Sequence, residues 1–419
     1  MPMTEQETPL QQCPQCSAAL EHIPGYVTWC EPCGWNANPQ SVNRKRSLLD
    51  RLNKRLGPKT SERLLDSLHD DSAKSQRAWF HFGAGVFGAL LLAGDAYLFY
   101  KGIRTLWGVH SPGTFFVGSL CLIFGLLLCP RLHRWKHRGL VRSEYPGLYR
   151  LLDEMAARMQ ARPVDTIQMG TEFNAFFTES DFTRKKLIYI GIPLFSILSL
   201  QEKIFVLAHE MAHNANRDMS RNWLNRYGQS TLSFIYDTIM PREYMREMLG
   251  PFFYLQKYVR QLVGALVFGV WYVYGLLGFR ESQYAEYAAD DLAYRISGTS
   301  AALGALEKPH YHETFYLTLE RIARYGYNND LFGELRKVMQ QMPDKEQRRI
   351  RRMLDTEMAR LDATHPPTSL RQRHVAALPN VELAMALTPE HIAELEREFA
   401  ELERKAQRDL LERYRAYYL

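Results

Sequence analysis

The segment SLQEKIFVLAHEMAHNANRDM, from Ser199 to Met219, decides how this chain folds around its chemistry. Ser199 is followed three residues later by Glu202, a capping-box pattern that predicts a helix beginning near Leu200. Apolar residues then recur at helical spacing: Ile204, Phe205, Ala208 and Ala212. The segment is therefore predicted to be a helix with one buried face.

The same helix carries the pattern H-E-x-x-H. His209 and His213 lie one turn apart on one face, so both imidazoles reach a single metal ion. Glu210 lies beside them as a carboxylate that can accept a proton from the water that zinc activates. The alternative, two histidines on a solvated helix face, fits poorly with an apolar and well-capped helix. The pattern predicts a catalytic zinc site.

A catalytic zinc needs a third protein ligand and an open position for water. The segment RESQYAEYAADDLAYRISG, which begins at Arg280, is predicted to be another helix on which Glu286 and Asp290 share a face. We choose Glu286 as the third ligand, and Asp290 as the acceptor that orients a ligating histidine. On spacing alone Glu281 or Asp291 would compete, and each of these carboxylates could instead be a solvated charge.

Four of the six cysteines form two C-x-x-C pairs separated by thirteen residues, and Gly34 follows the second pair. This spacing is typical of a zinc ribbon with a tetrahedral site. Two disulfides are disfavoured by a cytoplasmic N-terminus, and a redox pair by the lack of a surrounding βαβ pattern. We expect one structural zinc on Cys13, Cys16, Cys30 and Cys33. Whether the ribbon binds protein, nucleic acid or neither is left open.

Two apolar stretches predict a transmembrane hairpin. Residues 78–100 have spanning length with two ionisable side chains, and residues 112–129 form a shorter stretch without charge. Basic residues crowd the outer flanks, as in Arg44–Arg46 and Arg131–Arg138, whereas the loop between the stretches has two. By the positive-inside bias, the ribbon and the catalytic segment face the cytoplasm.

The first apolar stretch is rich in glycine. Ala84 and Gly88, like Gly85 and Ala89, have small-xxx-small spacing. This spacing indicates either close helix packing or the ordinary glycine content of membrane helices.

A third apolar run, residues 262–279, lies between His213 and Glu286. A single crossing there would leave Glu286 and the histidines on opposite sides of the membrane, so the number of crossings in this interval must be even. Either the weakly apolar residues 223–240 pair with this run as a fourth span, or both are embedded helices that line a cavity near the bilayer.

Further segments indicate a small sheet and a long terminal helix. Residues 164–169 and 186–192 have strand character, with residues 174–177 between them, which predicts a small sheet beside the active-site helix. Thr388 and Pro389 predict the start of a charged helix with a narrow apolar stripe. That stripe either docks onto the domain or contacts a partner protein.

Four motifs in matching order resemble the membrane zinc metalloproteases of the HtpX and CAAX-prenyl endopeptidase type. They are HEMAHNANRDM, the Asn-Ala-Phe that begins at Asn174, the AEYAAD that ends at Asp290, and THPPTSLR from Thr364 to Arg371. The resemblance covers about residues 145–378 and the two spans. It implies a gluzincin fold and a membrane protease.

The resemblance also implies roles for particular residues. His209, His213 and Glu286 bind zinc, and Glu210 is the general base. His365 approaches the site to stabilise the oxyanion or hold the substrate carbonyl, with support from Arg371, and a peptide docks along an edge strand that holds Asn174. From the residues alone, His365 precedes two prolines and is predicted to lie on an extended loop.

Two departures from the family pattern are visible. Relatives commonly have an arginine shortly before the ligand glutamate, where this chain has Ser282 and Gln283. The ribbon and the charged terminal helix lie outside the common core, which concerns regulation and partners. His310 and His312 could mimic metal ligands, but nothing completes a site around them and they are interpreted as loop residues.

The composition is that of an ordinary globular protein, with 46% hydrophobic and 23% charged residues, which excludes a disordered, collagenous or low-complexity chain. The net charge of +6 gathers at the membrane flanks, so no nucleic-acid partner is expected. The polar first twelve residues predict no cleaved signal.

We therefore expect a mainly α protein with a small β-sheet, a multi-pass protein of the cell membrane that hydrolyses peptide bonds with zinc. Its substrates are peptides or proteins, and membrane or misfolded proteins fit a role in quality control. The alternative is a membrane-anchored ribbon adaptor with a degenerate protease fold. The predicted units are a zinc ribbon (1–40), a basic linker (41–77), the hairpin (78–130), the metallopeptidase domain (131–380, with embedded helices near 223–279) and the charged helix (381–419).

Overall fold

The computed structural model describes most of the 419 residues. The described ranges are 12–39, 48–68, 71–108, 111–129, 139–180, 184–215, 223–240, 252–325, 330–357, 365–382 and 385–418. Several residues that carry predictions lie outside them, namely the basic runs Arg44–Arg46 and Arg131–Arg138, the end of the active-site segment from Asn216 to Met219, and Thr364.

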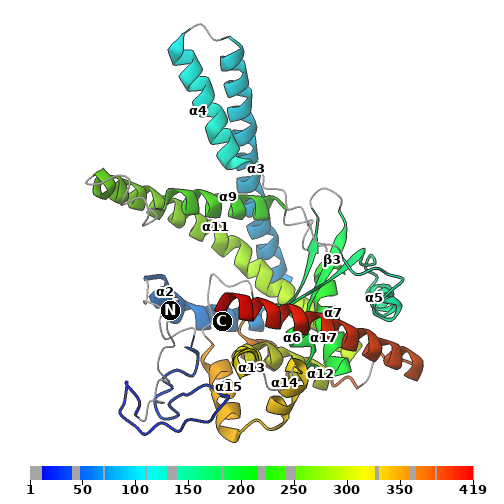
Figure 1. Cartoon of the computed structure of the whole chain (residues 1–419). Helices are drawn as coiled ribbons and strands as arrows, with labels where there is room; N and C mark the ends of the chain where they lie inside the picture. Colours follow the sequence, from blue (N-terminus) through cyan, green and yellow to red (C-terminus); the bar gives the residue numbers. More distant parts are fainter. Residues whose placement is uncertain are drawn as a thin grey trace.

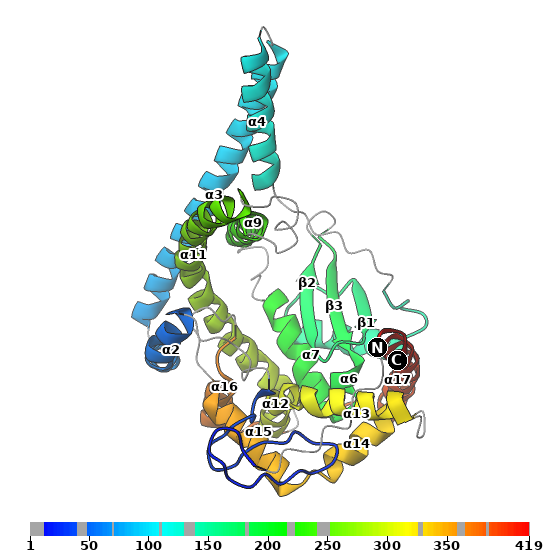
Figure 2. The same cartoon turned by 60° about the vertical axis from the view of Figure 1, so that its left-hand side comes forward.

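A three-stranded sheet stands beside the active-site helix (Figure 2). β1 (Thr166–Gly170) pairs in parallel with β3 (Lys186–Gly191), and β3 pairs antiparallel with β2 (Ala175–Glu179). The strand order β1-β3-β2 leaves β2 at an edge. The predicted small sheet in a mainly helical protein is thus confirmed, with residues 175–179 as its third strand.

Helix α7 (Leu200–Ala215) begins where the capping pattern predicts. The Ser199 amide donates to Glu202 Oε2 at 2.7 Å, and the Glu202 amide donates to Ser199 Oγ at 3.3 Å. These two bonds satisfy amides that the first helical turn leaves unpaired. Ile204, Phe205 and Ala208 are buried in the main core, so one face of α7 is fixed against the domain.

The remaining helices of the catalytic domain enclose this core. They are α5 (Pro146–Arg158), α6 (Ile192–Phe195), α12 (Thr299–Glu307), the 3-10 helix η1 (Lys308–Tyr311), α13 (His312–Tyr325), α14 (Leu331–Gln340), α15 (Asp344–Thr356), α16 (Thr368–Ala377) and α17 (Pro389–Tyr418). The predicted stripe on α17 docks onto the domain, because Leu395, Phe399 and Leu402 are buried in the main core. Glu398 of the same helix accepts hydrogen bonds at 2.7 Å from the first amides of α5.

Two helical hairpins extend from the domain (Figure 1). α2 (Leu48–Asp66) precedes α3 (Asp71–Trp107), which packs along α4 (Pro112–Leu128) to form a tower. α9 (Trp223–Ile239) packs along α11 (Phe252–Ser297) and extends to the side of that tower. Among the described residues one segment, Phe82–Trp107, is long and apolar enough to cross a membrane, and Pro112–Leu128 is apolar but shorter.

α11 is a single helix of 46 residues, whereas the sequence suggested an apolar run followed by a separate helix. It continues because no proline or glycine follows Gly278 until Gly298. The third apolar run and Glu286 therefore belong to one rod. That rod crosses the domain against α7 and brings Glu286 to the two histidines.

Close contacts fasten α9 to the base of the tower. A Cβ on Gly88 of α3 would overlap the carbonyl oxygen of Leu224, so only glycine allows this approach. The buried Tyr274 hydroxyl of α11 lies 3.1 Å from the Ala84 carbonyl and 3.2 Å from the Asn225 carbonyl. A Cβ on Gly85, by contrast, would meet nothing within 4 Å outside its own stretch of helix among the described residues. The packing interpretation therefore holds for the Ala84 and Gly88 pair.

Candidate metal centre

His209 and His213 of α7 meet Glu286 of α11 at one point. One ligand atom from each residue lies within 4.8 Å of the other two. His209 Nε2 is 3.4 Å from Glu286 Oε2, and His213 Nε2 is 3.4 Å from Glu286 Oε1. Donor atoms on a tetrahedral zinc are about 3.4 Å apart when each bond is about 2.1 Å long. The spacing therefore fits one metal ion.

The chemistry of the buried carboxylate supports the same fit. Glu286 Oε2 is buried and makes no hydrogen bond with acceptable geometry to any described residue, although His209, His365 and Arg371 surround it. Two imidazoles and one carboxylate are the donor set of zinc sites that keep a position for water. An oxygen that is buried without a hydrogen-bond partner at their focus is what a metal ligand requires.

Electrostatics keep Glu286 in the charged form that binds a metal. Burial would raise the pKa of Glu286, but close polar contacts with His209, His213 and His365 lower the pKa well below its ordinary value. Burial and Arg371 would lower the pKa of His209, but its hydrogen bonds to Asp290 and Glu286 outweigh them and raise it. Glu286 is therefore a carboxylate at neutral pH.

Asp290 and Arg371 support the centre from behind. Asp290 Oδ1 is 3.0 Å from His209 Nδ1, which leaves Nε2 of that ring for a metal. Arg371 of α16 donates to both Asp290 oxygens, at 2.8 and 2.6 Å. Burial would raise the pKa of Asp290, but the Arg371 charge and these hydrogen bonds lower it. A buried ion pair therefore holds the imidazole of His209.

The competing carboxylates take other positions. Asp291 Oδ1 bonds to Nε2 of His374 on α16 at 2.7 Å, so it is paired away from the centre. The side chain of Glu281 lies outside the described residues. Of the candidates the sequence left open, the structure brings Glu286 to the histidines.

Glu210 faces the edge of the sheet. Its Oε2 accepts a hydrogen bond from the Phe177 amide of β2 at 3.0 Å. Successive residues of a strand direct their backbone groups to opposite sides. The Asn174 carbonyl accepts a hydrogen bond from the Gly191 amide at 2.9 Å and so faces β3. The Phe177 amide, three residues later, therefore faces the free edge of β2. The general-base candidate is therefore anchored by the backbone of an edge strand.

The two remaining predicted residues lie at the mouth of the site. His365 Nδ1 is 2.9 Å from Glu286 Oε2, and its side chain is 65% exposed. Arg371 contacts Asp290 and Glu286, where the resemblance implied support for His365. Asn174 immediately precedes β2, and its Oδ1 accepts the Ala175 amide at 2.9 Å.

A cavity of about 670 Å³ opens over this centre. Asn174, His209, Glu210, His213, Glu286, His365 and Arg371 all line it, so one cavity collects the predicted catalytic, ligand and substrate residues. Apolar side chains form another part of the wall, from Leu194, Phe205, Val206, Ala305, Leu306 and Pro309. His310 also lines it and contacts Thr368 Oγ1 at 2.9 Å. It lies in η1 and His312 begins α13, so neither is a loop residue as predicted.

A scan against known protein families matches residues 145–378, more than half of the chain, to Peptidase family M48. The chain belongs to this family. M48 peptidases are zinc-dependent metallopeptidases, and the match covers every residue of the centre described above. No curated protein and no solved structure matched the chain in the corresponding searches.

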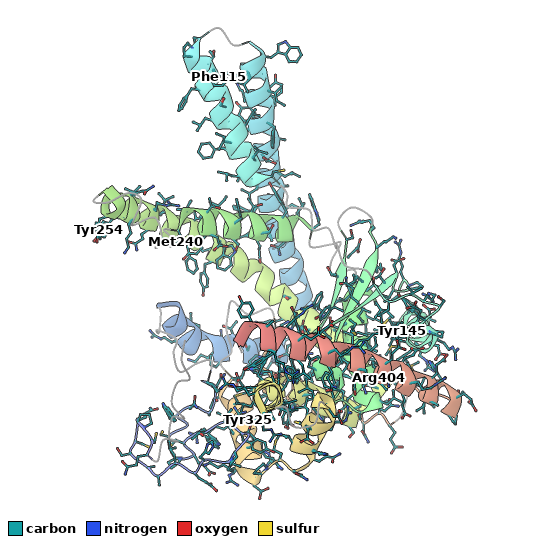
Figure 3. All side chains as sticks on the ribbon, in the orientation of Figure 1. Phe115, Tyr145, Met240, Tyr254, Tyr325 and Arg404 are labelled. Carbon is teal, nitrogen blue, oxygen red and sulfur yellow. The ribbon has the colours of Figure 1, made fainter. Side chains whose placement is uncertain are left out.

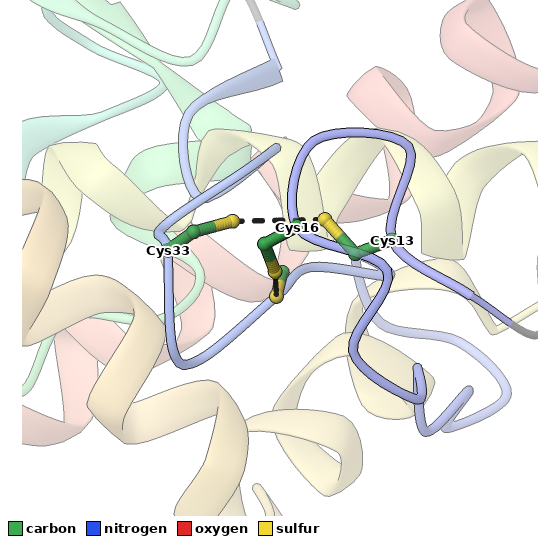
Figure 4. A group of neighbouring side chains, drawn as sticks. Cys13, Cys16 and Cys33 are labelled. Carbon is green, nitrogen blue, oxygen red and sulfur yellow. Dashed lines mark hydrogen bonds between the residues drawn. The ribbon is translucent and has the colours of Figure 1, made fainter.

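A second cluster lies in the ribbon, outside the M48 span. The four sulfur atoms of Cys13, Cys16, Cys30 and Cys33 lie within 4.8 Å of one another (Figure 4). Cys13 and Cys33 are 3.6 Å apart, and Cys16 and Cys30 are 3.5 Å apart. Sulfurs on one zinc are about 3.8 Å apart when each bond is about 2.3 Å long, so the cluster fits a tetrahedral ion. All four cysteines are free, which excludes the disulfide alternative in this structure.

The ribbon is docked on α15 of the M48 domain. The fully buried Arg349 donates to the Ala37 carbonyl at 2.7 Å and forms a buried pair with Glu346. Arg352 donates to the Glu31 carbonyl at 2.6 Å, and the Tyr26 hydroxyl donates to the Val338 carbonyl of α14 at 2.8 Å. The ribbon therefore packs on helices α14 and α15 of the same chain, a contact that the sequence did not predict.

Several site residues had no signal in the sequence. The Phe177 amide was missed because backbone groups carry no motif. Asn225 and Gln229 of α9 and Ser282 of α11 also line the cavity, although nothing in their sequence neighbourhood marks them. They reach the site through the packing of α9 on α3 and α11, which single-sequence periodicity does not specify.

Proposed function

We propose that the chain is an integral membrane zinc endopeptidase of the HtpX and CAAX-prenyl endopeptidase type within family M48. The observation that carries this proposal is the meeting of His209, His213 and Glu286 under a cavity that Glu210 shares with the edge of β2. The degenerate-fold alternative is disfavoured because every group required for hydrolysis is present and lines one cavity.

The chemistry divides between the metal and the chain. His209, His213 and Glu286 would hold the zinc, which would polarise the substrate carbonyl and lower the pKa of the attacking water. Glu210 accepts the proton of the attacking water and passes it to the leaving amine. In the substrate-free chain the Phe177 amide holds Oε2 of Glu210, and a peptide that pairs with this amide would release the carboxylate to face the water.

Arg371 and His365 assist in different ways. Arg371 orients His209 through Asp290, because its guanidinium spans both oxygens of that carboxylate. His365 lies at the exposed mouth of the cavity and is proposed to hold the substrate carbonyl. Its partner in the substrate-free chain is Glu286, so it must leave that oxygen when substrate and zinc are bound.

The substrate is proposed to be an extended peptide that adds to the free edge of β2. Ala175 and Phe177 direct their amides away from β3, and in the substrate-free chain these donors are taken by Asn174 Oδ1 and Glu210 Oε2. Main-chain hydrogen bonds of this kind do not depend on the side chains of the substrate, so proteins of varied sequence can bind. Membrane and misfolded proteins are therefore proposed substrates, with a role in protein quality control.

Membrane insertion is proposed for the tower of α3 and α4. Only 17% of the apolar 18-residue window within Phe82–Trp107 is buried, unlike the core helix of a soluble protein. Phe115 near the far end of the tower and Tyr254 at the tip of the α9 and α11 pair both lie on the surface (Figure 3). Exposed apolar side chains along these helices favour contact with a lipid bilayer. By the positive-inside bias, the basic flanks in the sequence support a cytoplasmic position for the ribbon and the catalytic cavity.

The proposal requires two zinc ions per chain, one catalytic and one in the ribbon. A ribbon adaptor would require only the second. The deciding experiment is cleavage of casein, or self-cleavage, by the detergent-purified protein and its Glu210→Gln variant, with zinc measured in both. We expect two ions in each and cleavage by the unaltered protein alone. We expect His209→Ala to keep only the ribbon ion. Cleavage by Glu210→Gln would overturn the proposal, as would an unaltered protein that holds one zinc ion per chain and keeps it in His209→Ala.

A further inference from the structure

The cavity has a second polar wall opposite β2. Asn225 and Gln229 of α9 line it together with Ser282 of α11, whereas Asn174 and Phe177 line it from the sheet. Figure 2 shows α9 and α11 to the left of β2, and α7 contacts both α11 and β2. A peptide lying against β2 in this cavity therefore has α9 on its other side.

Asn225 has an unused acceptor at this wall. The residue is 8% exposed, and its Oδ1 is buried without a hydrogen-bond partner among the described residues. Leaving such an acceptor unpaired costs about 1–3 kcal/mol. Rotation of this carboxamide towards the cavity that Asn225 lines would let a bound peptide supply the missing partner.

The spacing along α9 matches an extended chain. Asn225 and Gln229 are four residues apart, or about 6 Å along a helix with a rise of 1.5 Å per residue. Alternate residues of an extended peptide are about 6.6–6.8 Å apart. A peptide that pairs with β2 along one edge has every second residue's amide and carbonyl pointing away from β2. These groups need hydrogen-bond partners when the peptide is buried in the cavity.

The wall that carries Asn225 is rigid. The Tyr274 hydroxyl lies 3.2 Å from the Asn225 carbonyl, and a Cβ on Gly228 would meet the Tyr274 ring at 2.8 Å. At the same junction, Gly88 of α3 lies against the Leu224 carbonyl, which is also 3.5 Å from the Tyr274 hydroxyl. The backbone at Asn225 is therefore held by α3 and α11 together, which suits a side chain that positions a ligand.

We propose that Asn225 binds the substrate backbone. Its Oδ1 accepts a hydrogen bond from an amide of the extended peptide, on the edge that faces away from β2, and Gln229 makes the next polar contact along the peptide. The peptide is then held between a strand and a helix, so the enzyme recognises substrates as extended backbone on both edges. This inference rests on the proposed peptidase function and names a substrate-binding residue that the catalytic chemistry does not require.

The test combines a variant with an altered substrate. A fluorogenic peptide that the purified enzyme cleaves is prepared as a series, each member with one backbone amide N-methylated. Asn225→Leu removes the carboxamide at similar volume, and Ser230→Ala, an exposed position on the same helix, is the control. For the parent peptide we expect Asn225→Leu to raise KM about three- to tenfold with kcat retained, and Ser230→Ala to change neither.

For one methylated peptide, the KM of the unaltered enzyme should rise by about the same factor as Asn225→Leu produces with the parent peptide. With Asn225→Leu, methylation of that amide should raise KM no further. Thermal stability should not fall in Asn225→Leu, because an unpaired buried acceptor has been removed. An unchanged KM, or independent losses for every methylated peptide, would overturn the role of Asn225. Absence of cleavage by the unaltered enzyme would instead reject the peptidase function, so the two failures are distinguishable.

Discussion

Arg371 holds both oxygens of Asp290, with Nε at 2.8 Å from Oδ2 and Nη2 at 2.6 Å from Oδ1. Asp290 in turn lies 3.0 Å from Nδ1 of His209. A residue of α16 therefore orients a ligand on α7 through a carboxylate on α11. The order of the metal centre depends on three helices that are far apart in the sequence.

Replacing Arg371 with Leu should loosen this centre. The change leaves Asp290 as a buried charge without its partner, which costs about 3–5 kcal/mol of folding free energy. Zinc affinity at the catalytic site should fall about 10–100-fold, because the carboxylate that fixes His209 is no longer held. Melting temperature and chelator competition measure the two effects.

Arg373→Leu provides the matched control for Arg371, since Arg373 is exposed on the same helix. It should leave stability and zinc affinity close to their original values. Arg371→Lys should recover only part of the loss, because lysine keeps the charge but cannot bond to both oxygens at once. Unaltered zinc affinity in Arg371→Leu would show that Asp290 does not depend on the pair.

Asp290 should make the zinc-free protein sensitive to acid. The Arg371 guanidinium and the hydrogen bonds lower the pKa of Asp290 beneath its ordinary value of 3.8, so the folded state favours the carboxylate more than the unfolded state does. This contribution to stability is complete above the unfolded pKa and is lost as pH falls through the folded pKa.

Asp290→Asn should therefore differ most from the unaltered protein above about pH 5. The difference should shrink as the pH falls below 3.8 and through the lowered pKa of folded Asp290, where the carboxylate takes up a proton. Melting temperatures of both zinc-free proteins across this range provide the measurement. A difference that stays constant with pH would mean that the carboxylate charge does not contribute.

The part of the site that could be predicted from sequence is the part that depends on local spacing. His209 and His213 must share a face because they are one turn apart on a capped helix, and the two C-x-x-C pairs must bring four sulfurs together. Glu286 could be proposed on the same grounds. Its choice over Asp291 became clear only when the bond between Asp291 and His374 was seen.

The rest depends on how separate elements approach one another. The bond between Glu210 and the Phe177 amide requires α7 to lie against β2, and Asn225 reaches the cavity only because glycine at position 88 lets α3 and α9 touch. Neither contact leaves a periodic pattern in the sequence. The docking of the ribbon on α15 is hidden for the same reason, since Arg349 is one arginine among many in a charged helix.

Arg349→Leu should release the ribbon from the M48 domain. Arg349 is fully buried, bonds to Glu346 at 2.7 Å and donates to the Ala37 carbonyl. Its loss leaves Glu346 buried and unpaired, at a cost of about 3–5 kcal/mol. We expect a lower melting temperature and faster proteolysis within residues 12–39.

Its neighbour Arg348 offers the comparison. The pair of Arg348 with Glu31 also joins α15 to the ribbon, but the two side chains are 49% and 46% exposed. Such a pair contributes about 0–1 kcal/mol, so Arg348→Leu should leave the ribbon protected. Equal proteolysis of the two variants would mean that the buried arginine is not the main attachment.

Gly88→Ala and Gly85→Ala should change stability in opposite directions. Alanine is favoured over glycine in a helix by up to about 1 kcal/mol, so Gly85→Ala, which meets nothing within 4 Å, should be neutral or stabilising. At Gly88 the same methyl group would overlap the Leu224 carbonyl, and forcing α3 from α9 should cost about 1–3 kcal/mol. Melting temperatures in one detergent compare the two variants directly.

Because α9 carries Asn225, Gly88→Ala should also raise KM for the extended peptide while the catalytic zinc is retained. A stable Gly88→Ala protein with an unchanged KM would show that α9 is not held by this contact.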